Sequence, residues 1–189
     1  EGLWFSGSSA TLTYSGTSIY TFTNNVWTHM VITFDNVNSD FIVYINGTLN
    51  NTYSGNWMPN GSTTTIQGIG NDNRGGADTF DGYIDDYRAY NRILSLNEAL
   101  LLYQMGSNTL ITGGTLVSSP TIFTNDLVSG SSLYLVSANK QYVTLNSFST
   151  TSNGVTISFW FYPITSVTYA NTIFNFSNGY SSEIGRAHV

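Results

Sequence analysis

The sequence contains no cysteine, little charge and no long hydrophobic run. The absence of Cys excludes disulfide bridges, thiolate zinc sites and a cysteine nucleophile. Charged residues make up only 8% of the 189 residues, and five Lys and Arg against eleven Asp and Glu give a net charge of −6. This balance argues against a basic surface for nucleic acid. No apolar run approaches the roughly 20 residues of a membrane-spanning helix, so we expect no membrane insertion.

The two ends of the chain carry little functional information. The chain begins at Glu1 without an initiating Met or the pattern of a signal peptide, and we interpret it as a fragment that starts within a strand. Residues 184–189 match the translation of a widely used sequencing adapter. We therefore expect them to be a library artefact and assign no function to Arg186 or His188.

Alternating apolar and polar residues dominate the rest of the sequence. Hydrophobic residues make up 41% and aromatic residues 15% of the chain, enough to supply a core. The alternation predicts strands at residues 29–34, 41–45, 63–69, 83–90, 132–136, 141–145, 155–162 and 172–176. Asn46-Gly47 predicts a tight hairpin turn. Short strands at this spacing predict an all-β fold, a two-sheet antiparallel jelly-roll sandwich.

One short helix is predicted after the fourth of these strands. Ser95 and Glu98 form a capping box, in which each side chain can bond to the backbone of the other residue. Four residues then lie at helical spacing and are expected to pack on a sheet: Leu96, Ala99, Leu100 and Tyr103. Gly106 is expected to end the helix, and the small and polar residues 107–119 predict a connection between two units.

Four sequence blocks carry a resemblance to a known family. They are residues 27–35 (WTHMVITFD), 41–47 (FIVYING), 69–70 (IG) and 80–95 (FDGYIDDYRAYNRILS). In this order they resemble the C-terminal half of a laminin-G-like jelly-roll domain of the concanavalin A-like lectin/glucanase superfamily. Residues 131–179 instead resemble the N-terminal half of such a domain. The resemblance implies a tandem array from which the end of one repeat and the start of the next have been taken.

This arrangement predicts how the two parts of the chain assemble. Residues 1–107 alone would leave strand edges exposed, and residues 108–183 alone hold too few strands for a stable core. Together they supply nearly one full set of strands, joined by a linker that is long enough to cross a domain. We expect them to pack as one sandwich in circularly permuted order.

Acidic residues concentrate between residues 72 and 98, where calcium is one possible ligand. Carboxylate and amide oxygens suit Ca²⁺, and relatives in the superfamily bind this ion, so Asp72, Asn73, Asp78 and Asp81 are candidate ligands. The alternative is a solvated hairpin that carries Asp residues in its turns. Both interpretations stay open.

An aromatic loop offers a candidate ligand site. Trp57 and Tyr53 border a Gly- and Asn-containing segment, and an aromatic ring on a loop can stack on the face of a sugar. Asn71, Asp72 and Asn73 would then supply hydrogen bonds. The alternative is that these aromatics cover the edge of the sandwich, because aromatic residues usually bury themselves.

Several other prominent residues are interpreted as structural. Trp27 and Trp160 lie within strand patterns and are expected to pack between the sheets, where aromatic side chains bury large areas. His29 is expected to be a hydrogen-bonded structural histidine, although sequence alone does not forbid a catalytic triad in space.

Asp85 and Asp86 are adjacent in a predicted strand. Neighbouring side chains of a strand point to opposite faces, so one of the two carboxylates is expected to face inward. Burial of a charge requires a partner. Arg88 or Arg92 is expected to provide it through a bidentate ion pair.

Taken together, these features predict a non-catalytic glycan-binding or adhesion module in a larger repeat protein. Such a protein would be extracellular, on a cell surface or on a virion surface, with glycans, surface glycoproteins and neighbouring repeats as partners. Sandwich glycosidases of the superfamily carry a Glu-x-Asp-x-x-Glu strand, and this sequence has none. The alternatives are a structural spacer repeat without a small ligand and an accessory domain of a glycoside hydrolase.

Overall fold

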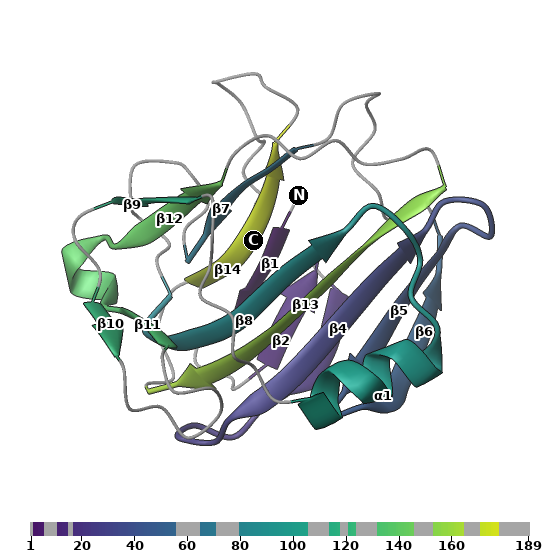
Figure 1. The fold of residues 1–189 in the computed structure, drawn as a ribbon, viewed down its shortest axis with the longest axis horizontal. Coiled ribbons are helices and arrows are strands. Elements are labelled where there is room, and N and C mark those ends of the chain that lie inside the picture. The colour runs from purple at the N-terminus through teal and green to yellow at the C-terminus, as the bar shows by residue number, and fades with distance from the viewer. Residues whose placement is uncertain are drawn as a thin grey trace.

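A computed structural model shows two antiparallel β-sheets packed face to face (Figure 1). The structure describes residues 2–5, 11–14, 17–55, 65–70, 80–105, 114–117, 121–123, 132–145, 153–164 and 171–177. One α-helix, α1 (Leu96–Met105), lies against the outer side of one sheet, and a short 3-10 helix, η1 (Ser137–Asn139), precedes a strand. The predicted all-β sandwich with one short helix is confirmed.

The strands divide equally between the two sheets. The first sheet contains, in spatial order, β3 (Thr17–Thr21), β2 (Thr11–Tyr14), β1 (Gly2–Phe5), β14 (Asn171–Ser177), β7 (Thr65–Ile69), β12 (Tyr142–Leu145) and β9 (Gly114–Val117). The second sheet contains β10 (Thr121–Phe123), β11 (Ser132–Leu135), β8 (Gly82–Tyr90), β13 (Gly154–Pro163), β4 (Thr28–Asp35), β5 (Asp40–Ile45) and β6 (Thr48–Ser54).

Strands from both parts of the chain alternate within each sheet. In the second sheet β13 lies between β8 and β4, and its residues pair with β4 from Gly154 opposite Asp35 to Phe161 opposite Thr28. In the first sheet β14 lies between β1 and β7. Hydrogen-bonded ladders therefore join residues 1–107 to residues 108–183 in both sheets.

Alternating side chains of the two sheets fill the space between them. The fully buried residues there include Phe34, Phe41, Phe159 and Phe174, and the Tyr14 ring stacks on the Phe41 ring with centroids 5.0 Å apart. Burial of one such side chain stabilises the fold by about 1.5–3 kcal/mol. Because these residues come from both sheets and both parts of the chain, this core holds the whole sandwich together.

The predicted turn at Asn46-Gly47 joins β5 to β6. Both residues have positive φ, 49° at Asn46 and 75° at Gly47, as a type I′ turn requires. The turn also supports the helix, because a Cβ atom added at Gly47 would lie only 2.9 Å from Cδ1 of Leu100. The Asn46 side chain accepts a hydrogen bond from the backbone N–H of His29, which ties the turn to β4.

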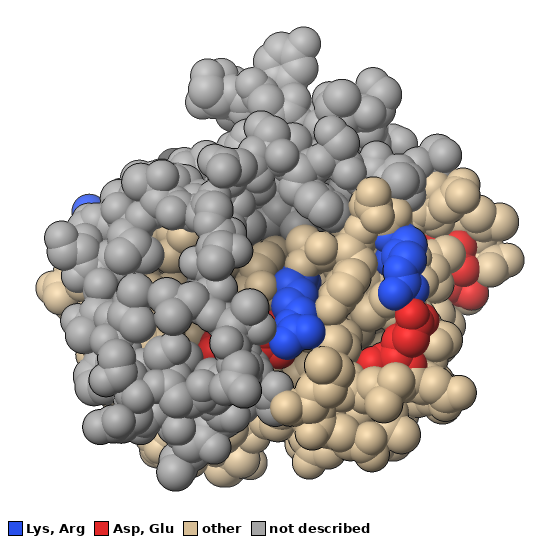
Figure 2. Space-filling view, in the orientation of Figure 1, with Lys and Arg blue, Asp and Glu red and all other residues tan. Residues whose placement is uncertain are grey.

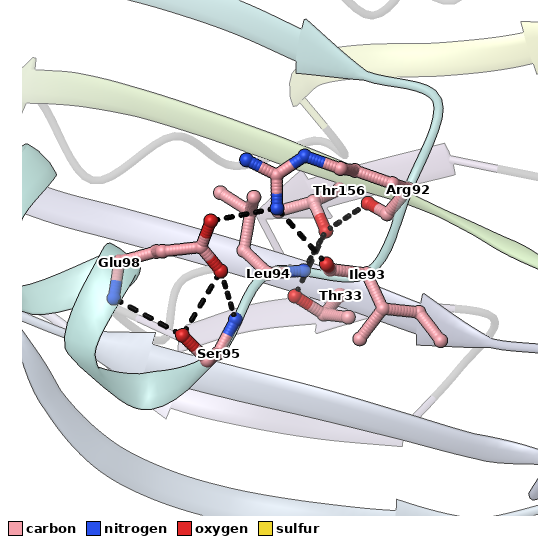
Figure 3. Close-up of polar contacts among 7 residues, drawn as sticks. All are labelled: Thr33, Arg92, Ile93, Leu94, Ser95, Glu98 and Thr156. Carbon is pink, nitrogen blue, oxygen red and sulfur yellow. Dashed lines mark hydrogen bonds and ion pairs between the residues drawn. The ribbon is translucent and has the colours of Figure 1, made fainter.

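The capping box at the start of α1 is confirmed, but the buried face of the helix differs from the prediction. The Ser95 backbone N–H donates to Oε2 of Glu98 over 2.8 Å, and the Glu98 N–H donates to Oγ of Ser95 over 3.4 Å (Figure 3). Ala99 and Leu102 are the buried residues of α1. Leu96, predicted to pack on the sheet, is 47% exposed. Four other apolar side chains of α1 are exposed as well, two of which, Leu100 and Tyr103, were also predicted to pack on the sheet: Leu100, Leu101, Tyr103 and Met105.

A buried threonine fixes the segment that leads into this helix. The hydroxyl of Thr156, on the outer side of β13, donates to the carbonyl of Arg92 over 2.8 Å and accepts from the N–H of Leu94 over 3.1 Å (Figure 3). The same hydroxyl of Thr156 also lies 3.1 Å from the hydroxyl of Thr33 in β4. Leu94 is thereby held against a small apolar cluster under the helix, which contains Val31, Tyr44, Leu94, Ala99 and Leu102.

Candidate functional site

The outer face of the second sheet is covered by α1 over β4 and β5 and carries aromatic and polar side chains elsewhere. Figure 2 shows this side of the molecule, where the described surface is mostly uncharged and the basic side chains near the centre lie beside acidic ones. Side chains two residues apart along a strand share a face, and directly paired residues of neighbouring strands lie side by side. The face is therefore organised in rows that run across the strands.

Four half-buried aromatic residues form one such row, which we call the aromatic row: Trp27, Tyr162, Tyr83 and Tyr134. The centroids of the Trp27 and Tyr162 rings are 5.5 Å apart, and those of Tyr162 and Tyr83 are 5.7 Å apart. Tyr83 stacks on Tyr134 with centroids 4.7 Å apart. The row thus presents a continuous, partly exposed aromatic surface that spans β11, β8, β13 and the residue just before β4.

A second row lies beside the first, about 7 Å further along the strands. This polar row consists of His29, Trp160, Asp85 and Ser132, of which Trp160 pairs directly with both His29 and Asp85. All four residues are buried, with 0%, 9%, 3% and 3% of their surfaces exposed. The Tyr103 ring of α1 lies over this row, with its centroid 5.5 Å from that of Trp160.

His29 is a hydrogen-bonded residue within the polar row. Its Nε2 lies 3.0 Å from Oγ of Ser158, a buried contact between β4 and β13. Burial lowers the pKa of His29 from 6.5 to about 4, and the positive charge of Arg88 acts in the same direction. The imidazole is therefore neutral at physiological pH. Ser158 is fully buried, so this Ser–His pair has no access for a substrate in the structure.

The two adjacent carboxylates depart from the predicted alternation, because β8 contains a β-bulge. The pairing of β8 with β13 shifts between Ser158 and Trp160, and Asp86 has a φ of 47°. A bulge places two residues opposite one and redirects a side chain. Asp85 pairs with Trp160 of the outer face, and Asp86 is ion-paired with Arg88, whose strand partner Ser158 belongs to that same face, so the prediction that one of the two carboxylates faces inward is wrong.

Arg88 is the basic partner in this bulge. Its Nε donates to Oδ1 of Asp86 over 2.6 Å, and the Arg88 side chain is 25% exposed. Burial alone would lower the pKa of Arg88, but the hydrogen bond and charge of Asp86, with those of Tyr90, raise it. Oδ1 of Asp85 instead accepts a hydrogen bond from the N–H of Asp86.

Arg92 takes part in a different ion pair. Its Nη1 lies 2.7 Å from Oε1 of Glu98, next to the capping box (Figure 3). Hydrogen bonds from Ser95 and Arg92 lower the pKa of Glu98 to about 2. Glu98 therefore carries its charge over the whole physiological pH range. Both side chains are well exposed, so the pair contributes little to stability.

Trp27 and Trp160 do not pack between the sheets, so that prediction is wrong. Trp27 lies half-buried in the aromatic row, and Trp160 lies in the polar row on the same outer face. The physical reason is the strand period, since Phe159 and Phe161 occupy the inward positions of β13 and leave Trp160 on the opposite side. Both tryptophans nevertheless make the aromatic contacts expected of structural residues.

Most of the ligand loop predicted from the sequence lies outside the described residues, including Trp57, Asn71, Asp72 and Asn73. Tyr53 is described. Its hydroxyl donates to the carbonyls of Ser18 and Ile19 over 3.3 and 3.4 Å, and its ring lies 5.6 Å from that of Phe41. These contacts tie the edge strand β6 to β3 of the opposite sheet.

The predicted calcium ligands are also mostly outside the described residues. Asp81 is described and half-buried, whereas Asp72, Asn73 and Asp78 are not. Within the described part of the chain, no three His, Asp or Glu side chains come together as a metal site would require. In the same part of the chain, no helix is long and apolar enough to cross a membrane.

The aromatic row was not recognised from the sequence. Tyr83, Tyr134 and Tyr162 belong to three strands that are far apart in the chain, and only the pairing of these strands brings the rings together. One available signal is that each of them alternates with a core residue, such as Ile84, Leu133 and Phe161. Such alternation places an aromatic side chain on the outer face of a sheet.

Comparison with protein families identifies a match over about the first half of the chain. The family model described as the concanavalin A-like lectin/glucanases superfamily, of the laminin G type, matches residues 1–99. Comparisons with the curated proteins and with the solved structures gave no match. The matched segment includes Trp27 and Tyr83 of the aromatic row and ends within α1.

Proposed function

The chain belongs to the concanavalin A-like lectin/glucanases superfamily, and from this premise we propose that it is a non-catalytic module that binds neutral glycans. The family suggests a lectin-like or adhesion module, and laminin G-like domains are typically non-catalytic and often extracellular. The observation that carries the proposal is the aromatic row. Four partly exposed rings in contact with one another offer an apolar face on which a sugar ring can stack.

The chemistry of the row fits a neutral sugar better than an anionic ligand. Tyr and Trp side chains combine an apolar ring with a polar group, and for this reason they are enriched at binding surfaces. The net charge of −6 and the carboxylates of Asp85 and Asp86 on the same face disfavour phosphates and sulfates. Aromatic stacking with hydrogen bonds from the tyrosine hydroxyls is the mechanism we propose.

The loop predicted from the sequence remains a second proposed position for the same function. Trp57 and Tyr53 would stack on the glycan, with Asn71, Asp72 and Asn73 as hydrogen-bonding residues, and Asp72, Asn73, Asp78 and Asp81 as possible calcium ligands. The contacts of Tyr53 with β3 favour a structural function for that residue. The row is therefore the stronger candidate.

We further propose that the parent is a tandem-repeat protein of the extracellular space, a cell surface or a virion surface. Its partners would be surface glycans or glycoproteins and the neighbouring repeats. In this view residues 1–107 end one repeat and residues 108–183 begin the next, and the two pack here in circularly permuted order. The ladders that join both parts in each sheet support this proposal.

A glycan array tests the proposed function, with and without Ca²⁺. The wild-type chain is expected to bind neutral glycans, and Tyr83→Ala is expected to reduce binding because it removes the central ring of the row. Tyr142→Ala is the matched control, since this half-buried tyrosine lies on β12 of the opposite sheet. Absence of binding by the wild-type chain would support a structural spacer repeat. Loss of binding in Trp57→Ala alone would place the ligand at the loop.

A further inference from the structure

Buried polar atoms without a hydrogen-bond partner gather in and beside the polar row. Among the described residues, four of the six such atoms belong to this region: Nδ1 of His29, Nε1 of Trp160, Oγ of Ser132 and Oδ2 of Asp86. Buried polar groups in native proteins almost always have a partner, either in the protein or in bound solvent or ligand. Four such atoms on one face therefore indicate polar partners from outside the chain, either solvent or the hydroxyls of a ligand.

The four atoms match the chemistry of hydroxyl groups. The indole N–H of Trp160 only donates, the carboxylate oxygen of Asp86 accepts, the hydroxyl of Ser132 does both, and Nδ1 of His29 donates or accepts according to the tautomer of the ring. A ligand that satisfies this set must itself both donate and accept. A sugar carries several such hydroxyls on neighbouring carbons, whereas an anion would meet the carboxylates of Asp85 and Asp86.

Tyr103 covers one end of the polar row, at Trp160 and His29. Its ring stacks on that of Trp160 at an interplanar angle of 26°, and it lies 5.9 Å from that of His29. Tyr103 belongs to the last turns of α1, is 36% exposed and is part of neither hydrophobic cluster, so a rotation of its side chain toward solvent would leave the core between the sheets in place. In the closed arrangement the Tyr103 ring occupies the position over the indole that a stacked sugar would take.

We infer that the polar row is a second sugar subsite, which opens when the Tyr103 side chain swings away from Trp160. The inference rests on the proposed function, because the glycan that enters this subsite is the one stacked on the aromatic row. The two rows are about 7 Å apart along the strands, a distance that consecutive rings of an oligosaccharide can bridge. The β-bulge at Asp86 serves this subsite by placing a second carboxylate on the outer face.

Nuclear magnetic resonance of the indole N–H groups tests this inference on the full 189-residue chain. The signals of Trp27 and Trp160 are assigned with Trp27→Phe and Trp160→Phe. Wild type, Tyr103→Ala and the control Leu101→Ala, an exposed residue of the same helix, are each titrated with three neutral trisaccharides: cellotriose, maltotriose and mannotriose. Circular dichroism establishes that both helix variants are folded.

The expected result is that a trisaccharide shifts the Trp27 and Trp160 signals together. In Tyr103→Ala the dissociation constant is expected to fall by about fivefold. In the wild type the sugar must first break the contact between the Tyr103 and Trp160 rings, which is worth about 1 kcal/mol, and the variant lacks this contact. Leu101→Ala behaves as the wild type.

Three other outcomes would overturn the inference, and they differ in what they say about the proposed function. A response of Trp27 with no response of Trp160 in any of the proteins rejects the second subsite but keeps the aromatic row, and solvent then satisfies the buried polar atoms. An equal gain in Leu101→Ala rejects Tyr103 as the cover. No response of either tryptophan to any trisaccharide rejects both the subsite and binding of these glycans on the row.

Discussion

Acid is expected to destabilise this fold through His29. The folded state lowers the pKa of His29 from 6.5 to about 4, so between these values the unfolded chain binds the extra proton and the folded chain does not. Stability therefore falls as the pH decreases through this window. The shift corresponds to about 3 kcal/mol between pH 7 and pH 4, a large part of the stability of an ordinary domain.

Urea unfolding at pH 7, 6, 5 and 4 measures this effect, with His29→Gln as the comparison. The variant lacks the titrating imidazole, so its free energy of unfolding should fall by about 3 kcal/mol less than that of the wild type over the same range. The lowered pKa values of Glu98 and Asp35 act mainly below pH 4.5 and are common to both proteins. Equal losses of stability in wild type and variant between pH 7 and pH 4 would refute the reasoning.

Three further predictions concern the fold. Thr156→Val should cost about 1–3 kcal/mol in urea unfolding, because the buried N–H of Leu94 loses its acceptor; an unchanged stability would contradict this. Gly47→Ala should cost about 1–2 kcal/mol, because its φ of 75° is strained for any other residue and the helix packs against it; a melting temperature equal to that of the wild type would argue otherwise. Residues 1–107 and 108–183, expressed separately, should each lack cooperative unfolding and regain it when mixed, and a cooperative transition in either part alone would oppose the proposed assembly.

Local sequence patterns predicted local structure well. Asn46-Gly47 defines its turn because few other pairs tolerate two positive φ values, and the capping box at Ser95 depends on contacts within one helical turn. The alternation in residues 29–34 and 155–162 predicted β4 and β13 to within one residue at each end. Such features need no knowledge of the rest of the fold.

Features that depend on pairing between distant strands were not predicted. The bulge at Asp86 arises from how β8 meets β13, and it reverses the face that simple alternation assigns to this residue. The buried face of α1 was also misjudged, because Ala99 and Leu102 pack in the cluster with Val31, Tyr44 and Leu94, whereas Leu96 is 47% exposed.

The candidate site shows the same limit. Trp27 and Trp160 were recognised as important aromatic residues, yet their place on the outer face follows from Phe159 and Phe161 occupying the core. The aromatic row needs β11, β8 and β13 side by side, and β11 and β13 come from a different part of the chain than β8. No spacing within one segment of the sequence encodes that neighbourhood.

Binding of a glycan on the aromatic row is the central claim, and a crystal structure of the chain with the best ligand from the glycan array tests it most directly. The account predicts a sugar ring stacked on Trp27, Tyr162 or Tyr83, on the outer face of the second sheet. A sugar bound instead at the loop around Trp57, with the aromatic row in contact only with solvent, would contradict it.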